Sequence, residues 1–174
     1  MKKDLNYAPL IDAPRIAARI AELGKAITRD YNGEPLVVVG VLKGAFIFLA
    51  DLVRQIESPV TVEFIGVASY TGTKSSGAVR LTHDLAADIN GKHVLLVEDI
   101  IDTGHTIDYL FETLAVRSPK SLKVAAFLSK PEAHTMKHRL DYVGFEISRE
   151  FVIGYGLDLD QYYRNLPFLA QVKT

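Results

Sequence analysis

A helical pattern of apolar residues stands near the start of the chain. Between residues 12 and 31 these residues recur at intervals of three and four positions. They are Ile16, Ile20, Leu23 and Ile27. This spacing places them on one face of a helix. Because Asp12 is a candidate N-cap and Pro14 falls in the first turn, the pattern predicts an amphipathic helix over 12–31.

Runs of β-branched and other apolar residues alternate with further helical patterns along the rest of the chain. The predicted strands cover residues 36–41, 60–69, 78–82, 93–97, 122–128, 142–147 and 151–152. The predicted helices after the first cover 45–56 and 106–116. Strands alternating with helices are typical of an α/β fold with a largely parallel central sheet flanked by helices. The run at 93–97 is apolar enough to be a central strand covered on both faces.

Residues 70–77 interrupt this pattern with small and polar side chains. The segment YTGTKSSG offers no apolar anchor and predicts a mobile loop. Elsewhere no repeat, linker or low-complexity tract divides the chain, and 174 residues lie within the usual size of one domain. We therefore expect a single domain over residues 1–174.

Composition and charge exclude several classes of function. The chain carries 20 basic and 21 acidic residues, a balance that argues against binding to the phosphate backbone of nucleic acid. It has no cysteine, so disulfides and thiolate metal sites are excluded. No segment approaches the roughly 20 apolar residues of a membrane span, and the N-terminus lacks the apolar run of a signal peptide. We expect a cytoplasmic protein that binds neither nucleic acid nor membranes.

The residues with the most specific chemistry follow the strand predicted at 93–97. In an open parallel sheet, ligands bind beyond the carboxyl ends of the strands. There the sequence DTGHT opens a helix, and the free backbone N–H groups at 103–106 suit a phosphate monoester. Glu98 and Asp99 end the strand, where carboxylates suit the cis-diol of a ribose or a hydrated magnesium ion.

The same residues could instead have a purely structural role. Asp102 or Thr103 would then only cap the helix, and the acidic pair would be a solvated strand end. Other phosphate-binding classes lack their loops, because the chain contains neither G-x-x-x-x-G-K-[ST] nor G-x-G-x-x-G.

Four ordered motifs extend over most of the chain. They are VLKGA at 41–45, SYTGTKSSG at 69–77, VLLVEDIIDTGHT at 94–106, and KPEAH at 130–134 with the later EFVIGYGLDLDQYYRNLP at 150–167. Together they resemble the type I phosphoribosyltransferases, and within that family the hypoxanthine (hypoxanthine-guanine) phosphoribosyltransferases of bacterial type. The resemblance implies the type I phosphoribosyltransferase fold with a small hood subdomain, formed by the loop at about 69–77 and the C-terminal segment at about 142–174.

The resemblance also implies an activity in purine salvage. The 5-phosphoribosyl group of phosphoribosyl pyrophosphate would pass to N9 of hypoxanthine, and of guanine, giving IMP or GMP and pyrophosphate. Magnesium would assist as the cofactor, and the assembly would be a homodimer or a homotetramer. The preference between hypoxanthine, guanine and xanthine stays open, and so does the rival function of a non-catalytic regulator that senses nucleotides.

One carboxylate receives the catalytic role by this resemblance. A 6-oxopurine that attacks through N9 must lose a ring proton, and a carboxylate beside N7 can accept it. The resemblance assigns this role to Asp102. It assigns the phosphoribosyl group to Glu98, Asp99, Asp102, Thr103, Gly104, His105 and Thr106. It assigns pyrophosphate to Lys43, Gly44, Ser69, Tyr70 and Arg164, and the metal to Glu98, Asp99 and Asp158.

Base recognition is assigned to a second group of residues. By the resemblance these are Lys130, Phe151, Val152 and Asp158. An ammonium donor at Lys130 suits a carbonyl oxygen at purine C6, and Phe151 would stack on the base, although it could equally be a core residue. His134 stands where relatives often have arginine, so its role is open, as is a cis bond between Leu42 and Lys43.

Overall fold

A computed structural model describes residues 5–69 and 79–173. Its helices are α1 (Ala13–Tyr31), α2 (Phe46–Val53), α3 (His105–Ala115) and the short 3₁₀ helix η1 (Pro131–Ala133). Its strands are β1 (Tyr7–Ile11), β2 (Leu36–Leu42), β3 (Val60–Ser69), β4 (Val79–His83), β5 (His93–Ile101), β6 (Ser121–Ser129), β7 (Tyr142–Glu146), β8 (Val152–Ile153) and β9 (Leu169–Val172). The loop predicted at 69–77 lies, apart from the backbone of Ser69, outside the described residues.

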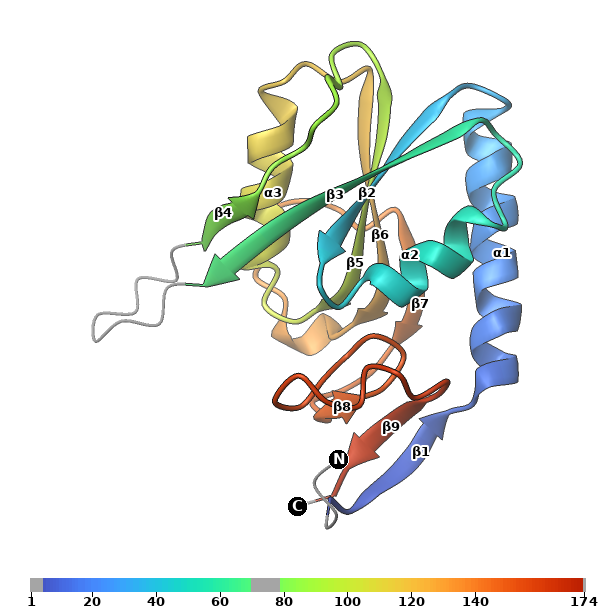
Figure 1. Cartoon of the computed structure of the whole chain (residues 1–174), viewed down its shortest axis with the longest axis vertical. Coiled ribbons are helices and arrows are strands. Elements are labelled where there is room, and N and C mark those ends of the chain that lie inside the picture. Colours follow the sequence, from blue (N-terminus) through green and yellow to red (C-terminus); the bar gives the residue numbers. More distant parts are fainter. Residues whose placement is uncertain (1–4, 70–78, 174) are drawn as a thin grey trace.

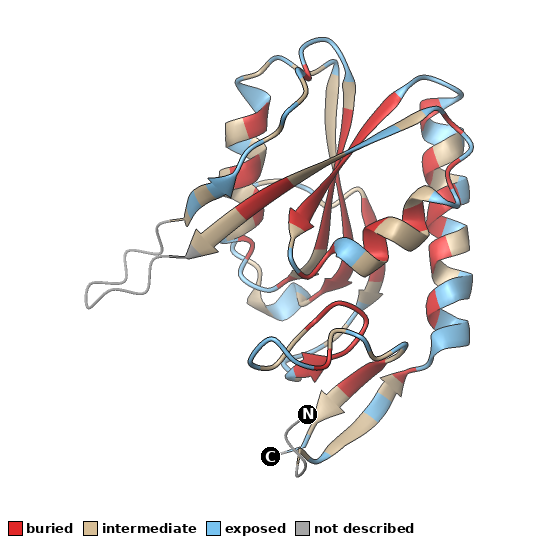
Figure 2. Cartoon of the chain, viewed as in Figure 1, coloured by how far each residue is buried: buried red, intermediate tan, exposed pale blue. Residues whose placement is uncertain are grey.

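The main sheet confirms the predicted α/β architecture. Its six strands lie in the order β4-β3-β2-β5-β6-β7, and all neighbours are parallel except β3 and β4. Helices α1 and α2 cover one face and α3 covers the other (Figure 1). Between them β5 is a central strand whose residues 94–97 are fully buried, as expected of an apolar run covered on both faces (Figure 2).

Alternate residues of the central strands build two separate cores. In β5, Leu95 and Val97 pack with α1 and α2, whereas Val94 and Leu96 pack with α3. The period-two alternation of side chains in a strand produces this division. The sheet is therefore held rigidly from both sides, and its carboxyl ends form a fixed edge.

A second, three-stranded sheet lies beyond the carboxyl ends of the main strands (Figure 1). Its strands are antiparallel in the order β1-β9-β8, so the first and last strands of the chain pair with each other. This sheet and the C-terminal turns stand where the hood subdomain is expected. They face the edge at which a parallel sheet binds ligands.

Several predicted boundaries are corrected by the structure. The second helix ends at Val53 rather than at 56, because the chain continues in tighter turns in which Gln55 and Ile56 donate to the carbonyl oxygens three residues before them. Strand β5 runs to Ile101 rather than to 97, because β6 pairs with it as far as Ser129. Strands β1 and β9 were not predicted.

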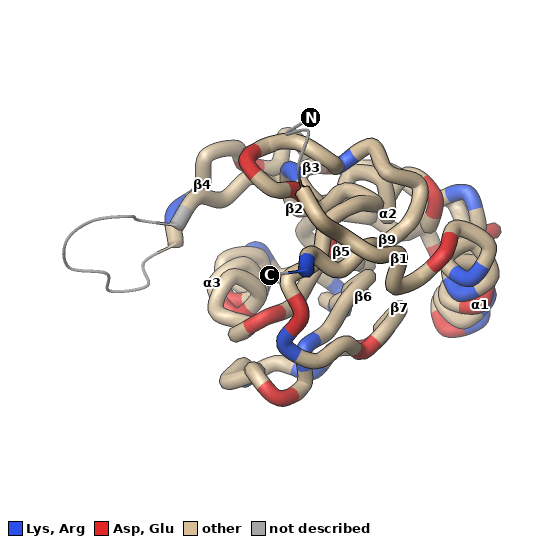
Figure 3. The backbone as a smooth tube through the Cα atoms, turned by 90° about the horizontal axis from the view of Figure 1, so that it is seen from below, with Lys and Arg blue, Asp and Glu red and all other residues tan. Residues whose placement is uncertain are grey.

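Charge is mixed over the described surface elements. Seen from the side of the small sheet, basic and acidic residues share α1 (Figure 3), where Arg19 and Glu22 form an ion pair of 2.6 Å. Asp12 caps this helix as predicted, since its side chain accepts a hydrogen bond from the N–H of Arg15 at 2.9 Å. Within the described part of the chain, no helix is both long and apolar enough to cross a membrane.

Candidate active site

A cleft of about 300 Å³ lies at the carboxyl ends of β2 and β5. Ten of the residues predicted to bind the phosphoribosyl group, pyrophosphate or metal line it. They are Lys43, Gly44, Glu98, Asp99, Asp102, Thr103, Gly104, Thr106, Asp158 and Arg164. Three separate stretches of sequence therefore meet at one edge of the sheet. We call this space the phosphoribosyl cleft.

The loop between β5 and α3 forms one wall of the phosphoribosyl cleft. Gly104 is the N-cap of α3 with φ of 87°, a left-handed conformation that glycine adopts without strain. A Cβ at this position would also lie 2.4 Å from Cβ of Met136. Among the described residues, no side chain caps the helix. The interpretation of Asp102 or Thr103 as a helix cap is therefore wrong. The first backbone N–H groups of α3 are not used by a side-chain cap, so they can donate hydrogen bonds to an anion.

The acidic pair lies inside β5 rather than behind it. Glu98 is buried at 6% exposure, so its interpretation as a solvated strand end is wrong. Its Oε1 accepts from the N–H of Asp99 at 3.1 Å, and Oδ1 of Asp99 accepts from the N–H of Ile100 at 2.7 Å. Burial, and then the neighbouring Asp99 carboxylate, raise the pKa of Glu98 well above its usual value. Burial also raises the pKa of Asp99.

These raised pKa values predict that Glu98→Gln stabilises the free protein. An acid whose folded pKa is raised contributes stability below its unfolded pKa, here 4.5, and loses it as pH rises through the folded pKa. The substituted glutamine cannot ionise, so at about pH 7 we expect a thermal midpoint higher by about 2–4 °C, and at about pH 4 no difference. Thermal unfolding at both pH values measures this. An equal shift at both would contradict the assignment.

The loop between β2 and α2 forms the opposite wall of the phosphoribosyl cleft. Its Leu42–Lys43 peptide bond is cis, which answers the question that the sequence left open. Gly44 lies so close to the acidic pair that a Cβ there would be 1.4 Å from Oδ2 of Asp99. Nζ of Lys43 donates to Oε1 of Gln161 at 3.3 Å, which links this loop to the C-terminal segment.

Arg164 and Asp158 reach the same cleft from the C-terminal segment. Nη2 of Arg164 lies 2.8 Å from Oδ1 of Asp158, and Nη1 donates to the carbonyl oxygen of Gly156 at 2.7 Å. Nη2 also donates to Oε1 of Gln161 at 3.4 Å, so these three acceptors hold the guanidinium while it lines the cleft. A held arginine presents its remaining donors in a fixed direction, which suits a phosphate or pyrophosphate oxygen.

A smaller cleft of about 250 Å³ adjoins the first and contains the residues predicted to bind the base. Its lining is Asp99, Ile100, Asp102, Lys130, Phe151, Val152, Leu157 and Asp158. Nζ of Lys130 lies 3.5 Å from Oδ2 of Asp102, and the Lys130 side chain is only 13% exposed. Phe151 is 54% exposed, so its interpretation as a core residue is wrong. We call this space the base cleft.

The remaining predicted residues lie at the margins. His105 is exposed and does not line either cleft. Nε2 of His134 is 3.3 Å from Oγ of Ser129 and 3.4 Å from the carbonyl oxygen of Ile101, so this ring lies beside the end of β5. Ser69 ends β3, and Tyr70 lies outside the described residues. Their proposed contacts with pyrophosphate stay predictions.

Sequence reasoning missed apolar lining residues of both clefts, including Val67, Ile100 and Leu157. Val67 lines the phosphoribosyl cleft, Leu157 the base cleft, and Ile100 both. Val67 and Ile100 belong to strands that look like ordinary core, and Leu157 is a single apolar residue between Gly156 and Asp158, so no local signal marks any of them as a lining residue. They show that the clefts have apolar walls between a few polar groups, as small-molecule sites usually do.

The oxygen donors fit a hydrated magnesium ion better than a fully protein-bound one. Glu98, Asp99 and Asp158 line the phosphoribosyl cleft, yet within residues 5–69 and 79–173 no group of three His, Asp or Glu side chains is placed to hold a metal. Mg²⁺ usually keeps several waters and binds through one or two carboxylates and substrate phosphates. The donor set therefore suits an ion that arrives with a phosphorylated substrate.

Comparison with known proteins gives a consistent result. The family model described as "Phosphoribosyl transferase domain" matches residues 7–160. The hypoxanthine phosphoribosyltransferase of Haemophilus influenzae is 48% identical over 167 residues, which cover 94% of this chain and 93% of that protein. The crystal structure of a hypoxanthine-guanine phosphoribosyltransferase from Bacillus anthracis has a TM-score of 0.91 at 42% identity, covering 98% of this chain and 99% of that one.

A further solved structure contains a reaction product. The hypoxanthine phosphoribosyltransferase of Trypanosoma cruzi, in complex with the product IMP, has a TM-score of 0.90 at 42% identity. The match covers 99% of this chain and 97% of that one. Both the core sheet and the C-terminal segment are therefore included in the likeness.

Proposed function

The chain belongs to the phosphoribosyl transferase family, and we propose that its two adjoining clefts transfer the 5-phosphoribosyl group from phosphoribosyl pyrophosphate to N9 of hypoxanthine and guanine. The products are IMP or GMP and pyrophosphate, which makes the activity one of purine salvage. The observation that carries this proposal is the position of Asp102. It lines both clefts and lies 3.5 Å from Lys130.

The phosphoribosyl cleft supplies binding groups for each part of phosphoribosyl pyrophosphate. The uncapped N–H groups at the start of α3, with the hydroxyls of Thr103 and Thr106, receive the 5-phosphate. Glu98 and Asp99 accept hydrogen bonds from the ribose hydroxyls. Pyrophosphate lies against the Lys43–Gly44 loop and Arg164, which both line this cleft.

The base cleft distinguishes a 6-oxopurine from an aminopurine. Nζ of Lys130 donates a hydrogen bond to the 6-oxo group, which an exocyclic amine cannot accept. The ring of Phe151, exposed at the mouth of the cleft, stacks on the purine, and the backbone of Val152 contacts its edge. A site built for one hydrogen-bonding pattern rejects the other because its own polar groups would be left unpaired.

The reaction is a substitution at the anomeric carbon of the ribose. Pyrophosphate leaves as N9 approaches, and positive charge develops on the ribose ring. Asp102 accepts the proton that the purine loses at N7. The carboxylates of Asp99 and Asp158 would hold a hydrated magnesium ion, which would supply positive charge to offset that of the pyrophosphate. A cytoplasmic location and a homodimeric or homotetrameric assembly stay predictions.

Assays with five bases test this function. Purified protein with phosphoribosyl pyrophosphate and Mg²⁺ is expected to use hypoxanthine and guanine with kcat/KM at least about 100-fold above that for adenine or uracil. Xanthine is included to define the preference at C2. Turnover of adenine or uracil in place of the 6-oxopurines would contradict the role of Lys130. Absence of turnover on every base would favour a nucleotide-sensing regulator.

A further inference from the structure

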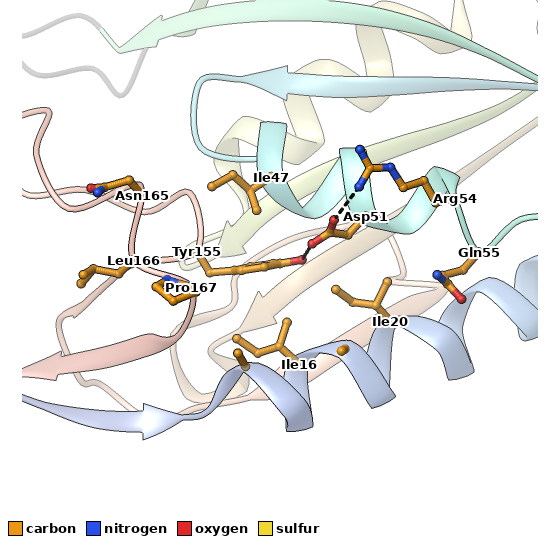
Figure 4. Close-up of a pocket in the computed structure, with 12 residues that line it drawn as sticks. Ile16, Ile20, Ile47, Asp51, Arg54, Gln55, Tyr155, Asn165, Leu166 and Pro167 are labelled. Carbon is orange, nitrogen blue, oxygen red and sulfur yellow. Dashed lines mark hydrogen bonds and ion pairs between the residues drawn. The ribbon is translucent and has the colours of Figure 1, made fainter.

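One partly buried hydrogen bond joins the C-terminal segment to the helix that follows the Lys43–Gly44 loop. The hydroxyl of Tyr155 donates to Oδ2 of Asp51 at 2.5 Å, and Figure 4 shows the phenol ring extending from the C-terminal segment to α2. Oδ1 of Asp51 also lies 3.6 Å from Arg54 on the exposed side. Neither Asp51 nor Tyr155 lines the phosphoribosyl cleft or the base cleft.

Tyr155 is held firmly within its own segment. It is 5% exposed, its ring lies 4.8 Å from that of Phe127, and its N–H donates to the carbonyl oxygen of Leu166 at 2.9 Å. Burial, followed by the bond to Asp51, raises the pKa of Tyr155, so the phenol keeps its proton as the donor. The ring can therefore transmit a constraint from Asp51 to the backbone of this turn.

The turn that carries Tyr155 touches both partners of the proposed pyrophosphate site. A Cβ on Gly156 would lie 2.1 Å from the carbonyl oxygen of Gly44, so the two backbones are in direct contact. The carbonyl oxygen of Gly156 also accepts from Arg164 at 2.7 Å. On the other side of the bond, α2 begins two residues after Gly44. The Asp51–Tyr155 hydrogen bond therefore connects α2 to a turn that also contacts Arg164 and the Lys43–Gly44 loop.

Side-chain packing around this hydrogen bond is open on one side. An open pocket of about 540 Å³, lined in part by Asp51 and Tyr155, lies between α1, α2 and the C-terminal segment (Figure 4). Its apolar lining includes Ile16, Ile20, Ile47 and Leu166. Side chains that face a cavity lose contacts on that side, so they constrain their neighbours less than a close-packed interior does. The directional hydrogen bond holds α2 and the turn together where side-chain packing is incomplete.

We propose that Asp51 and Tyr155 are positioning residues that fix the distance between the Lys43–Gly44 loop and Arg164, and thereby set the affinity for pyrophosphate and phosphoribosyl pyrophosphate. The inference rests on the proposed function. It assigns no contact with substrate to either residue. The expected effect is selective, because only ligands that contact both the Lys43–Gly44 loop and Arg164 depend on the distance between them.

Tyr155→Phe tests the inference, because it removes only the hydroxyl. We expect KM for phosphoribosyl pyrophosphate, and KM for pyrophosphate in the reverse reaction with IMP, to rise about fivefold to tenfold, the net effect of losing one ordinary hydrogen bond. KM for hypoxanthine and kcat should change by less than about twofold. Asp51→Ala should reproduce the effect, and Asp51→Asn, which keeps an acceptor oxygen, should largely restore the normal values.

The chain offers a matched control in Tyr142→Phe. Tyr142 is 6% exposed and donates to Oδ2 of Asp30 at 2.8 Å, so it forms the same kind of partly buried bond between β7 and α1. We expect this variant to lose stability without a change in either KM. Equal KM values for Tyr155→Phe and Tyr142→Phe, or an effect confined to kcat, would overturn the inference.

Direct binding separates this inference from the proposed function. Calorimetric titration with Mg²⁺ and pyrophosphate needs no turnover, and Tyr155→Phe is expected to bind about fivefold more weakly than Tyr142→Phe. An unaltered pyrophosphate affinity would contradict the positioning role even if the wild type were inactive on every base. Inactivity of the wild type with the expected loss of affinity would contradict only the proposed function.

Discussion

Replacing Asp102 by Asn is expected to lower kcat by about 10²- to 10⁴-fold, the usual contribution of a positioned general base. Asn has nearly the same shape and keeps an oxygen for Lys130, whose Nζ lies 3.5 Å from the Asp102 carboxylate. It cannot accept the proton that the purine must lose. KM for phosphoribosyl pyrophosphate should change little, because its 5-phosphate is assigned to the backbone N–H groups at the start of α3. Steady-state kinetics with hypoxanthine measure both values.

A second carboxylate gives the control for this substitution. Asp84 pairs with Arg117 at 2.8 Å outside both clefts, so Asp84→Asn removes a charge without touching the proposed site. We expect its kcat to stay near the wild-type value. Near-normal turnover by Asp102→Asn would contradict the role of this residue as the base. A large rise in KM for phosphoribosyl pyrophosphate would instead indicate that the substitution had disturbed the loop that begins α3.

The predictable part of the site is the part that is contiguous in sequence. The nine positions from Glu98 to Thr106 leave a buried strand and enter a helix, so strand end, glycine and helix start follow from local pattern. Local pattern could not show that Gly104 itself is the N-cap, or that β6 extends the pairing of β5 past the acidic pair. Those features depend on neighbouring segments that are distant in sequence.

The parts that could not be predicted depend on contacts between distant segments. Strands β1 and β9 pair from opposite ends of the chain, and β1 contains Pro9, which weakens any strand signal. Strand propensity depends on the neighbouring strand, so two short segments carry little information separately. The Asp51–Tyr155 bond is of the same kind, because both residue types are common and their spacing carries no pattern.

The exposure of individual side chains also could not be predicted from the local sequence pattern. Phe151 in a short apolar run looks like core, yet it lies at the mouth of the base cleft because β8 begins only at Val152. Glu98 shows the reverse, since a carboxylate at a strand end is usually solvated but here is buried, and β6 still pairs with β5 at this position. In both cases a residue departs from its usual environment at the site where a ligand is proposed to bind.

Replacing Gly44 by Ala is expected to lower kcat/KM for phosphoribosyl pyrophosphate by about 100-fold or more, the effect of displacing binding groups by about 1 Å. The added Cβ would lie 1.4 Å from Oδ2 and 2.4 Å from Cγ of Asp99. Asp99 is held by the N–H of Ile100 at 2.7 Å, so either the carboxylate rotates away or the loop recedes. Both movements increase the distance between the Lys43–Gly44 loop and the Asp99 carboxylate. Overpacking should also cost about 1–3 kcal/mol of stability.

Two further variants show whether Gly44→Ala lowers activity through the displaced binding groups or only through a loss of stability. Gly33 has φ of 82° and open space around it, so Gly33→Ala should cost about 1–3 kcal/mol through backbone strain while kinetics stay normal. Asp99→Ala removes the carboxylate that clashes with the Gly44→Ala methyl group. In the double variant the two effects on unfolding should therefore not add, and part of the stability lost in Gly44→Ala should return. Additive effects would contradict the direct contact, and a kcat/KM of Gly44→Ala within about threefold of the wild type would contradict the need for this close fit.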